Sequence, residues 1–290
     1  MANHAHHHGN MNPEQQKAMM EQEIRLMKNM NNIKYKIAVM SGKGGVGKST
    51  VAVNLATTFQ KKGFKTGILD VDIHGPNVPK MLGLEGKLLD VDENQLIPVK
   101  TEDGIEVLSM AFLLDSLDTP IIWRGPQKSG AIKQFMSDVR WGNLDVLIID
   151  NPPGTGDEPL TVLQSLPGID AVVMVTTPNS VSQEDVLKCV KMVKMLKVEN
   201  IGLVENMAYF VCPDCGKKIH IFGEDNMEEF ADFMEIKYLG DIPLTEQVAK
   251  SSENDKPITL KDEDSPVTKG FSEIVDKIDG LFLNKDKWIL

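Results

Sequence analysis

The chain has few cysteines, only three in 290 residues. Three thiols cannot build a disulfide framework, so we expect a chain that folds in a reducing compartment, the cytoplasm. Long apolar runs are also missing: none approaches the ~20 residues that a bilayer-spanning helix needs. The first thirty residues lack the apolar stretch of a secretory signal. A membrane protein or a secreted protein is therefore not expected.

Basic residues are fewer than acidic ones, 31 Lys and Arg against 42 Asp and Glu. The net charge is therefore −11, and the pI is near 5.1. Nucleic acids and anionic membranes are bound through basic surfaces. We therefore expect neither as a partner. The hydrophobic share of 41% is enough for a substantial core.

Composition and local sequence signals divide the chain into three parts. Residues 1–32 are a flexible His- and Met-rich tail followed by a helix, which Asn12-Pro13-Glu14-Gln15 begins with an N-cap, a first-turn proline and a capping-box glutamine. One face of this helix should pack on the body or on a partner subunit, and it carries Met20, Ile24, Met27 and Met30. Residues 33–285 form the main domain, and residues 286–290 are a C-terminal tail.

Within the main domain, short apolar runs alternate with helical stretches. The runs are continuous rather than alternating, as in strands that are covered on both faces. They lie at 37–40, 66–69, 105–110, 146–149, 171–175 and 201–204, and the helical stretches at 49–62, 127–139, 181–197 and 265–283. We predict an α/β fold with a doubly wound, mainly parallel sheet, whose ligands bind at the carboxyl ends of the strands. Residues 86–104 are expected to form a small inserted β-hairpin.

The strongest motif, Gly-x-x-x-x-Gly-Lys-Ser, follows the first predicted strand and opens a helix. This context is that of a phosphate-binding P-loop, in which backbone N–H groups and the helix N-terminus surround phosphates. Lys48 is expected to contact the β- and γ-phosphates, and Ser49 to bind Mg²⁺. The cradle comprises Gly42, Lys43, Gly44, Gly45, Val46, Gly47, Lys48, Ser49 and Thr50.

Acidic residues follow two of the predicted strands. Asp70 and Asp72 come after the second strand, and Asp150 ends the strand 146–149 and opens a Pro/Gly-rich loop. Asp150 has the Walker B arrangement, which holds Mg²⁺ through water. Each aspartate alone could cap a helix or a turn, but their shared position beside a P-loop favours a nucleotide site.

Two cysteines lie close together in Cys212-Pro213-Asp214-Cys215-Gly216. A C-x-x-C pair provides two ligands, whereas an iron–sulfur cluster or a structural zinc needs four. Cys189 shares a helical face with valines and is expected in the core. Two chains related by a two-fold axis would together supply four thiolates. A zinc site with Cys212, Cys215 and His220 is the alternative.

Lys43, directly after the first glycine of the motif, resembles the additional lysine of deviant-Walker ATPases such as MinD, ParA and the nitrogenase iron protein. In those proteins it reaches the nucleotide of the opposite subunit, which implies a homodimer and a catalytic role for Lys43 in charge stabilisation. A merely solvated lysine is the other interpretation. The same resemblance makes Asp72 the residue that positions the attacking water, with Asp70 supporting the Mg²⁺ shell.

The ordered set of motifs is similar to that of the Mrp/NBP35/ApbC family of iron–sulfur cluster carriers. It consists of the P-loop, Asp-x-Asp-x-x-Gly-Pro from Asp70, Trp123-Arg124-Gly125-Pro126, Asp150-x-Pro-Pro-Gly-Thr-Gly-Asp157, and Glu205-Asn206-Met207 followed by Cys-Pro-x-Cys-Gly. The resemblance implies a slow Mg²⁺-dependent ATPase that holds a labile [4Fe–4S] cluster between two subunits and passes it to apo iron–sulfur proteins.

The resemblance also implies that Asn206 and the backbone near Pro243 flank the adenine, although Asn206 at a strand end could equally be structural. Two rival functions share part of the pattern. A MinD/ParA-type positioning ATPase with a zinc knuckle shares the phosphate site and would bind membrane or DNA. Its MinD form needs a basic amphipathic helix, but the C-terminal helix carries Glu273, Asp276 and Asp279. A nitrogenase-type reductase separates its cluster cysteines widely in the sequence.

Overall fold

The structure is a computed structural model that describes residues 12–73, 75–93, 95–113, 125–212, 214–223, 226–253 and 256–283. The predicted tail before residue 12, Trp123 and Arg124 of the family motif, and the C-terminal tail 286–290 lie outside these ranges.

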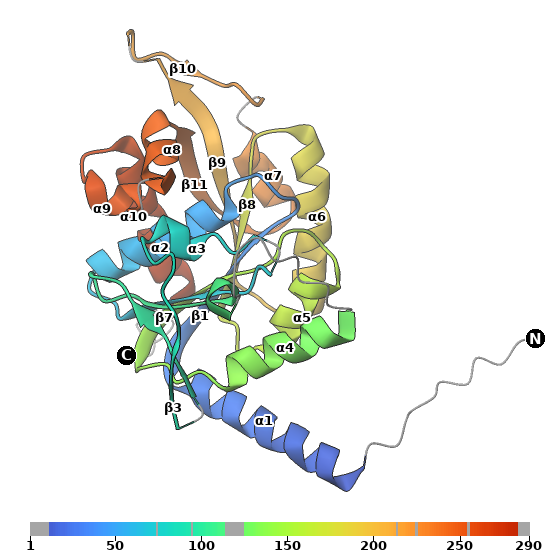
Figure 1. Ribbon diagram of the computed structural model, residues 1–290. Coiled ribbons are helices and arrows are strands. Elements are labelled where there is room, and N and C mark those ends of the chain that lie inside the picture. The colour runs from blue at the N-terminus through green and yellow to red at the C-terminus, as the bar shows by residue number, and fades with distance from the viewer. Residues whose placement is uncertain are drawn as a thin grey trace, which may run out of the picture.

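A mainly parallel sheet forms the centre of the molecule (Figure 1). Its strands follow the order β10-β9-β8-β1-β7-β2-β6-β5, and β11 also pairs with β9. The central pairings are parallel, whereas β10 pairs antiparallel with β9 and β5 pairs antiparallel with β6. The strands are β1 (Ile33–Ser41), β2 (Thr66–Asp70), β5 (Val99–Lys100), β6 (Glu106–Ser109), β7 (Leu144–Asp150), β8 (Ala171–Thr176), β9 (Ile201–Val211), β10 (Lys218–Ile219) and β11 (Lys237–Leu244).

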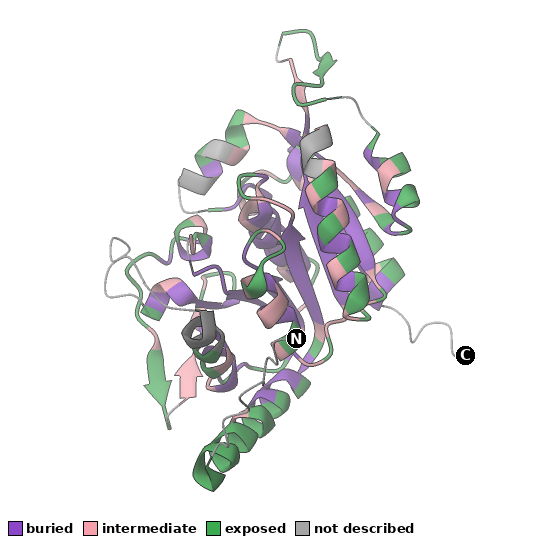
Figure 2. Ribbon diagram, turned by 90° about the vertical axis from the view of Figure 1, so that its right-hand side faces the viewer, coloured by how far each residue is buried: buried purple, intermediate pink, exposed green. Residues whose placement is uncertain are grey.

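Helices cover both faces of this sheet, and each face has its own core. Successive residues of β1 alternate between the two cores: Ile37 and Val39 belong to one, and Ala38 and Met40 to the other. The first core includes residues of α2 (Lys48–Lys61), α3 (Val78–Met81), α9 (Ile258–Lys261) and α10 (Pro266–Ile278). The second includes residues of α4 (Gly125–Ser137), α5 (Asp157–Ser165), α6 (Ser180–Met195) and α7 (Met227–Phe233). The sheet between them is almost wholly buried (Figure 2).

The predicted doubly wound α/β fold is therefore confirmed. The predicted helix 265–283 is α10 followed by a π-helical turn over Asp279–Leu283. The strand expected at 201–204 is longer than predicted, because β9 continues to Val211. Sequence periodicity missed β11, α5, α7 and α8 (Glu246–Glu253). No helix in the described ranges is long and apolar enough to cross a membrane.

The inserted hairpin is also present, as β3 (Asp90–Asp92) paired antiparallel with β4 (Gln95–Ile97). A short 3₁₀ turn over Met110–Leu113 follows β6. The predicted insertion 86–104 reaches slightly too far, because Val99 and Lys100 already belong to the edge of the main sheet.

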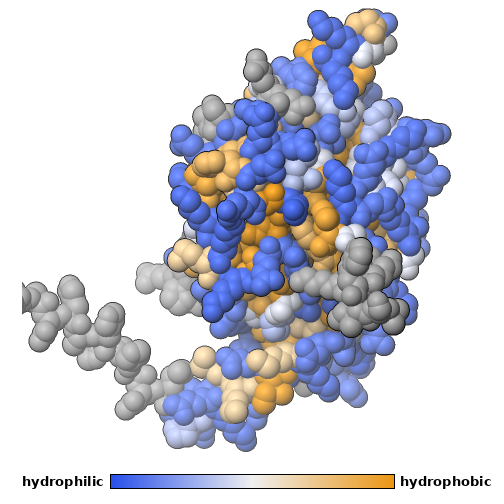
Figure 3. Space-filling model, turned by 180° about the vertical axis from the view of Figure 1, so that it is seen from behind, coloured by the Kyte–Doolittle hydropathy of each residue, from blue (hydrophilic) through white to orange (hydrophobic). Residues whose placement is uncertain are grey.

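The N-terminal helix α1 (Pro13–Asn31) begins with the predicted capping box between Asn12 and Gln15. Only its C-terminal end packs on the body: Met30 is 1% exposed, and Asn29 Nδ2 donates to the Ser137 carbonyl at the end of α4. The expectation for the other residues of the stripe is not met within this chain, since Met20, Ile24 and Met27 are 66%, 57% and 56% exposed. They contribute to a hydrophobic patch on α1 (Figure 3).

Candidate nucleotide site and cysteine hairpin

The P-loop connects the end of β1 to the start of α2 at the carboxyl edge of the sheet (Figure 1). Gly45 and Gly47 have φ values of 80° and 83°, a region that glycine enters without steric cost. Gly42 lies directly against α6, because a Cβ at this position would be only 2.6 Å from the Asp185 carbonyl carbon. The predicted cradle is thus a tight turn, held between the strand, its own helix and α6.

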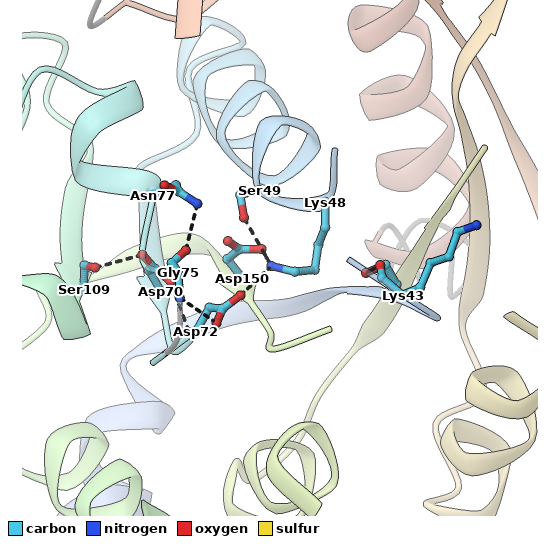
Figure 4. Close-up of polar contacts among 10 residues, drawn as sticks. Lys43, Lys48, Ser49, Asp70, Asp72, Gly75, Asn77, Ser109 and Asp150 are labelled. Carbon is cyan, nitrogen blue, oxygen red and sulfur yellow. Dashed lines mark hydrogen bonds and ion pairs between the residues drawn. The ribbon is translucent and has the colours of Figure 1, made fainter. Parts of the chain in front are cut away.

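Lys48, the first residue of α2, points toward the carboxylates that end β2 and β7 (Figure 4). Its Nζ lies 2.5 Å from Asp150 Oδ1, 4.0 Å from Asp72 Oδ2 and 3.2 Å from Ser49 Oγ. The Lys48 side chain is only 6% exposed, and that of Asp150 is completely buried. The structure therefore brings together the P-loop lysine, the predicted Mg²⁺ ligands and the proposed water-positioning aspartate.

Asp70 lies behind this pair. Ser109 Oγ donates to Asp70 Oδ2 at 2.8 Å, and the Asp72 backbone N–H donates to Asp70 Oδ1 at 3.2 Å. Burial, followed by the proximity of the Asp150 carboxylate, raises the pKa of Asp70 to about 8. Burial also raises the pKa of Asp150, although the Lys48 ammonium opposes this effect. Asp70 therefore holds its proton to a higher pH than an exposed aspartate does, and Lys48 lies close enough to offset the charge of Asp150.

Lys43 does not take part in this cluster. Its side chain points away from Lys48 and the three aspartates (Figure 4). The hydrogen bond from Ser41 Oγ to the Lys43 carbonyl, 2.9 Å, fixes the backbone at that point. Lys43 is half-buried. This direction is compatible with the predicted contact to a second subunit.

Asn206 and Pro243 lie side by side, as the predicted adenine site requires. Asn206 of β9 pairs with Ile242 of β11, the neighbour of Pro243. The Asn206 side chain, however, is already engaged: its Nδ2 donates to the Val46 carbonyl of the P-loop at 2.8 Å. Asn206 thus has a structural contact with the phosphate loop, and its role toward adenine stays a prediction.

The cysteine pair lies on a hairpin that projects beyond the body of the molecule (Figure 1). β9 and β10 form its two limbs, and backbone bonds from Cys212 N to Lys217 O and from Gly216 N to Cys212 O close its tip. Cys212 is half-buried and Cys215 is exposed. Backbone N–H groups of Cys215 and Asp214 lower the pKa of the Cys212 thiol, which favours the thiolate that binds metals.

His220 does not complete a metal site with this pair. Its ring packs toward Tyr209, with centroids 6.1 Å apart. Across the residues that the structure describes, no three side chains of the His, Cys, Asp and Glu types converge on a common point. A single chain therefore offers two thiols at this place and no third ligand among those residues.

Cys189 is a core thiol, as its helical face predicted. It is completely buried, and its Sγ–H lies 3.5 Å from the Gly154 carbonyl and 3.8 Å from the Ser41 carbonyl. Burial raises the pKa of this thiol to about 11. It is therefore neutral and takes no part in the cysteine hairpin.

Comparisons with known proteins agree with this combination of sites. The family model described as NUBPL iron-transfer P-loop NTPase matches residues 32–279. This chain belongs to that family. An iron-sulfur cluster carrier protein from Methanocaldococcus jannaschii is 48% identical over 270 residues, which are 92% of this chain and 93% of that protein. The iron-sulfur cluster transfer protein NUBPL of Dictyostelium discoideum is 44% identical over 86% of this chain and 77% of its own length.

Solved structures place this iron-transfer P-loop NTPase among nucleotide-binding folds. A nucleotide-binding protein from Archaeoglobus fulgidus, solved in complex with ADP, is 41% identical, with a TM-score of 0.72 over 80% of this chain and 91% of that one. MinD from Aquifex aeolicus has a TM-score of 0.62 over 85% of this chain and 97% of its own, but is only 22% identical, so it supports the fold alone. The relatives favour cluster transfer over cell positioning.

Sequence reasoning about this family member missed two features of the site. Ser109, which donates to Asp70, is the last residue of β6 and carries no motif. The contact of Asn206 with Val46 joins residues 160 positions apart, and no local pattern reports such a contact. The carboxyl end of β6 was nevertheless a place to search for Ser109, because ligands of parallel sheets gather at that edge.

Asp70 should make stability depend on pH. Its folded pKa of about 8 exceeds its ordinary value of 3.8, so the folded chain binds more protons between these values. The free energy of unfolding is then expected to fall as pH rises through this window, by at most about 1.4 kcal/mol per pH unit from this group. Asp70→Asn should flatten that dependence. Urea unfolding at several pH values, without Mg²⁺ or nucleotide, checks this, and equal slopes for parent and variant would contradict it.

Proposed function

We propose that the chain is an ATP-binding and ATP-hydrolysing iron–sulfur cluster carrier that works in the cytoplasm. It assembles a labile [4Fe–4S] cluster between two copies of itself and transfers that cluster to apo-proteins. The observation that carries the proposal is that the described part of the chain holds both a P-loop site and a projecting pair of thiols. Both are proposed to belong to one domain, residues 33–285. Family membership supports the same function.

The residues at the P-loop fit Mg²⁺ and a nucleotide phosphate chain. Asp150 Oδ2 is buried and has no hydrogen-bond partner among the described residues, so an acceptor is available for a Mg²⁺-bound water. Ser49 at the first turn of α2 provides the hydroxyl ligand. Lys48 binds the β- and γ-phosphates, exchanging part of its contact with Asp150 for them. A bound Mg²⁺ ion supplies charge compensation for the phosphates.

Hydrolysis needs a positioned water and additional positive charge. Asp72, 4.0 Å from Lys48 Nζ, orients the water toward the γ-phosphate. Lys43 stabilises the developing charge on the nucleotide of a second copy, since its side chain points away from its own cluster of carboxylates (Figure 4). Turnover is slow because half of this charge comes from another chain.

The cargo site also needs a second copy. Each chain presents Cys212 and Cys215, and a cubane cluster binds four thiolates. Two hairpins that meet at a two-fold axis supply them. The exposed position of the pair lets the cluster leave without unfolding of either chain. Zinc bound by the same four thiolates is the alternative cargo.

Lys48→Ala should abolish tight ATP binding, because it removes the cation that contacts the β- and γ-phosphates. Asp72→Ala should keep binding but lose turnover by about 10²-fold or more, the usual contribution of a group that assists proton transfer or water attack. Binding is measured by isothermal titration calorimetry and turnover by phosphate release. Hydrolysis by the Lys48 variant at the parent rate would show that the P-loop assignment is wrong.

Cys212→Ala and Cys215→Ala should each remove the cluster and keep ATP binding, because the hairpin lies outside the phosphate loop. Cys189→Ala is the matched control and should retain the cluster, since that thiol is buried against Gly154 and Ser41. Anaerobic reconstitution followed by absorbance near 400 nm and iron analysis provides the readout. Iron bound by the Cys215 variant, or lost only from the Cys189 variant, would refute the choice of ligands.

A further inference from the structure

One strand, β9, runs from the P-loop region to the cysteine hairpin, and it has two differently supported parts. Its first part lies inside the sheet, with Glu205 paired to Thr176 of β8 and to Asp241 of β11. Beyond Glu205 the pairing with β8 ends. The last part pairs instead with β10, through Phe210 and Val211. The outer part, with Cys212 at its end, is therefore an arm that extends from the sheet.

The strand is irregular where the two parts join. Asn206 pairs with Ile242, but the next pair is Phe210 with Leu244, so β9 advances by four residues while β11 advances by two. Met207 within this step has a φ of 57°. The left-handed region is unfavourable for a residue with a side chain, and such strain is retained mostly at functional positions. We call Asn206 and Met207 the β9 hinge.

The β9 hinge lies against the P-loop. Asn206 Nδ2 donates to the Val46 carbonyl at 2.8 Å, and Asn206 is only 6% exposed. A Cβ at Gly47 would be 2.2 Å from Asn206 Nδ2 and 3.5 Å from Met207 Cε. Both hinge side chains therefore approach the P-loop at the residue before Lys48, and they do so because that residue is glycine.

Peptide planarity links this contact to phosphate binding. The Val46 carbonyl and the Gly47 N–H belong to one rigid peptide unit and point in opposite directions. A phosphate that orients the Gly47 N–H inward therefore also orients the Val46 carbonyl outward, toward Asn206. Phosphate binding and the Asn206 hydrogen bond favour the same orientation of this peptide.

The other end of the arm is also tied to the body. Gly223 lies against the loop that follows β8, because a Cβ at this residue would be 2.1 Å from the Pro178 carbonyl oxygen. Pro178 belongs to the segment that leads into α6, and α6 contacts Gly42. The chain is thus held near the body on both sides of the arm, by the P-loop at Asn206 and by the segment before α6 at Gly223, and the β9 hinge is its strained point.

We propose that Asn206 and Met207 are positioning residues through which the occupied P-loop fixes the cysteine arm. This inference rests on the nucleotide site of the proposed function, but not on the identity of the metal cargo. Nucleotide binding strengthens the Asn206–Val46 hydrogen bond and holds the arm in one orientation. Loss of nucleotide weakens that bond and lets the arm, with its two thiols, move about Met207.

Hydrogen–deuterium exchange of the full-length, metal-free chain tests this, with and without saturating Mg²⁺ and a non-hydrolysable ATP analogue. In the parent, nucleotide should slow exchange of the arm, residues 207–219, by about fivefold, since a neutral hydrogen bond contributes about 1 kcal/mol net. Protection of the P-loop, residues 42–49, in the same experiment reports that nucleotide is bound. The inner part of β9 reports whether the sheet remains folded.

For Asn206→Ala, the nucleotide concentration is raised until the P-loop is protected as in the parent, and under that condition the response of the arm should be lost. Met207→Gly, which removes the side chain that approaches Gly47 and gives the backbone more freedom at the hinge, should increase exchange of the arm without nucleotide and reduce the nucleotide effect. Asn200→Ala is the matched control. Asn200 directly precedes β9, and its side-chain Nδ2 donates to the Asp170 carbonyl, away from the P-loop. The nucleotide response of the arm should therefore persist in this variant.

The inference is overturned if Asn206→Ala retains the parent response, or if the parent protects its P-loop while the arm does not respond. In either case the proposed nucleotide site stands. A parent chain that binds no nucleotide would overturn the proposed function and this inference together. Faster exchange than in the parent throughout β9 of the Asn206 variant would show that Asn206 only stabilises the sheet, which also contradicts the inference.

Discussion

The ion pair between Lys48 and Asp150 is the interaction on which the nucleotide site depends. A buried ammonium and a buried carboxylate are tolerated only when they are paired, and removal of one partner from such a pair costs about 3–5 kcal/mol. Here the pair joins the start of α2 to the end of β7, which fixes the P-loop relative to the Walker B strand. Asp72 is a second buried carboxylate near Lys48, and Asp70 lies behind the pair, where burial raises its pKa to about 8.

The cysteine hairpin, in contrast to the buried ion pair, is an exposed site. It has little buried surface, projects from the body, and offers one accessible thiol and one thiol with a lowered pKa. A rigid, four-ligand site within one chain would hold its metal permanently. In the proposed dimer, two ligands in each chain would instead make retention of the cluster depend on how the two chains meet, which suits a cargo that must be released. The P-loop and the hairpin are connected through β9, so one strand belongs to both sites.

The sequence predicted most of the fold and the phosphate site, because their signals are local. The P-loop glycines, the strand-end aspartates and the C-x-x-C pair each report their chemistry within a few residues. Contacts between distant segments could not be predicted from local patterns. The Asn206 bond to Val46 and the Ser109 bond to Asp70 depend on the register of the sheet. The stripe on α1 shows a different limit, since periodicity identified Met20, Ile24 and Met27 as one face but not whether this chain covers it. β11 was missed because Gly240, Asp241 and Pro243 interrupt its apolar residues, and α7 was missed because it has only 7 residues.

The central claim is that two copies of this chain share one cluster. Native mass spectrometry of the anaerobically reconstituted protein tests it most directly, because one spectrum gives both the number of chains and the mass of the bound metal. The account predicts a species of two chains with about four irons and four sulfides, and none of that cargo on a single chain. A single chain that holds a complete cluster, or chains that bind zinc and take up no iron, would contradict it.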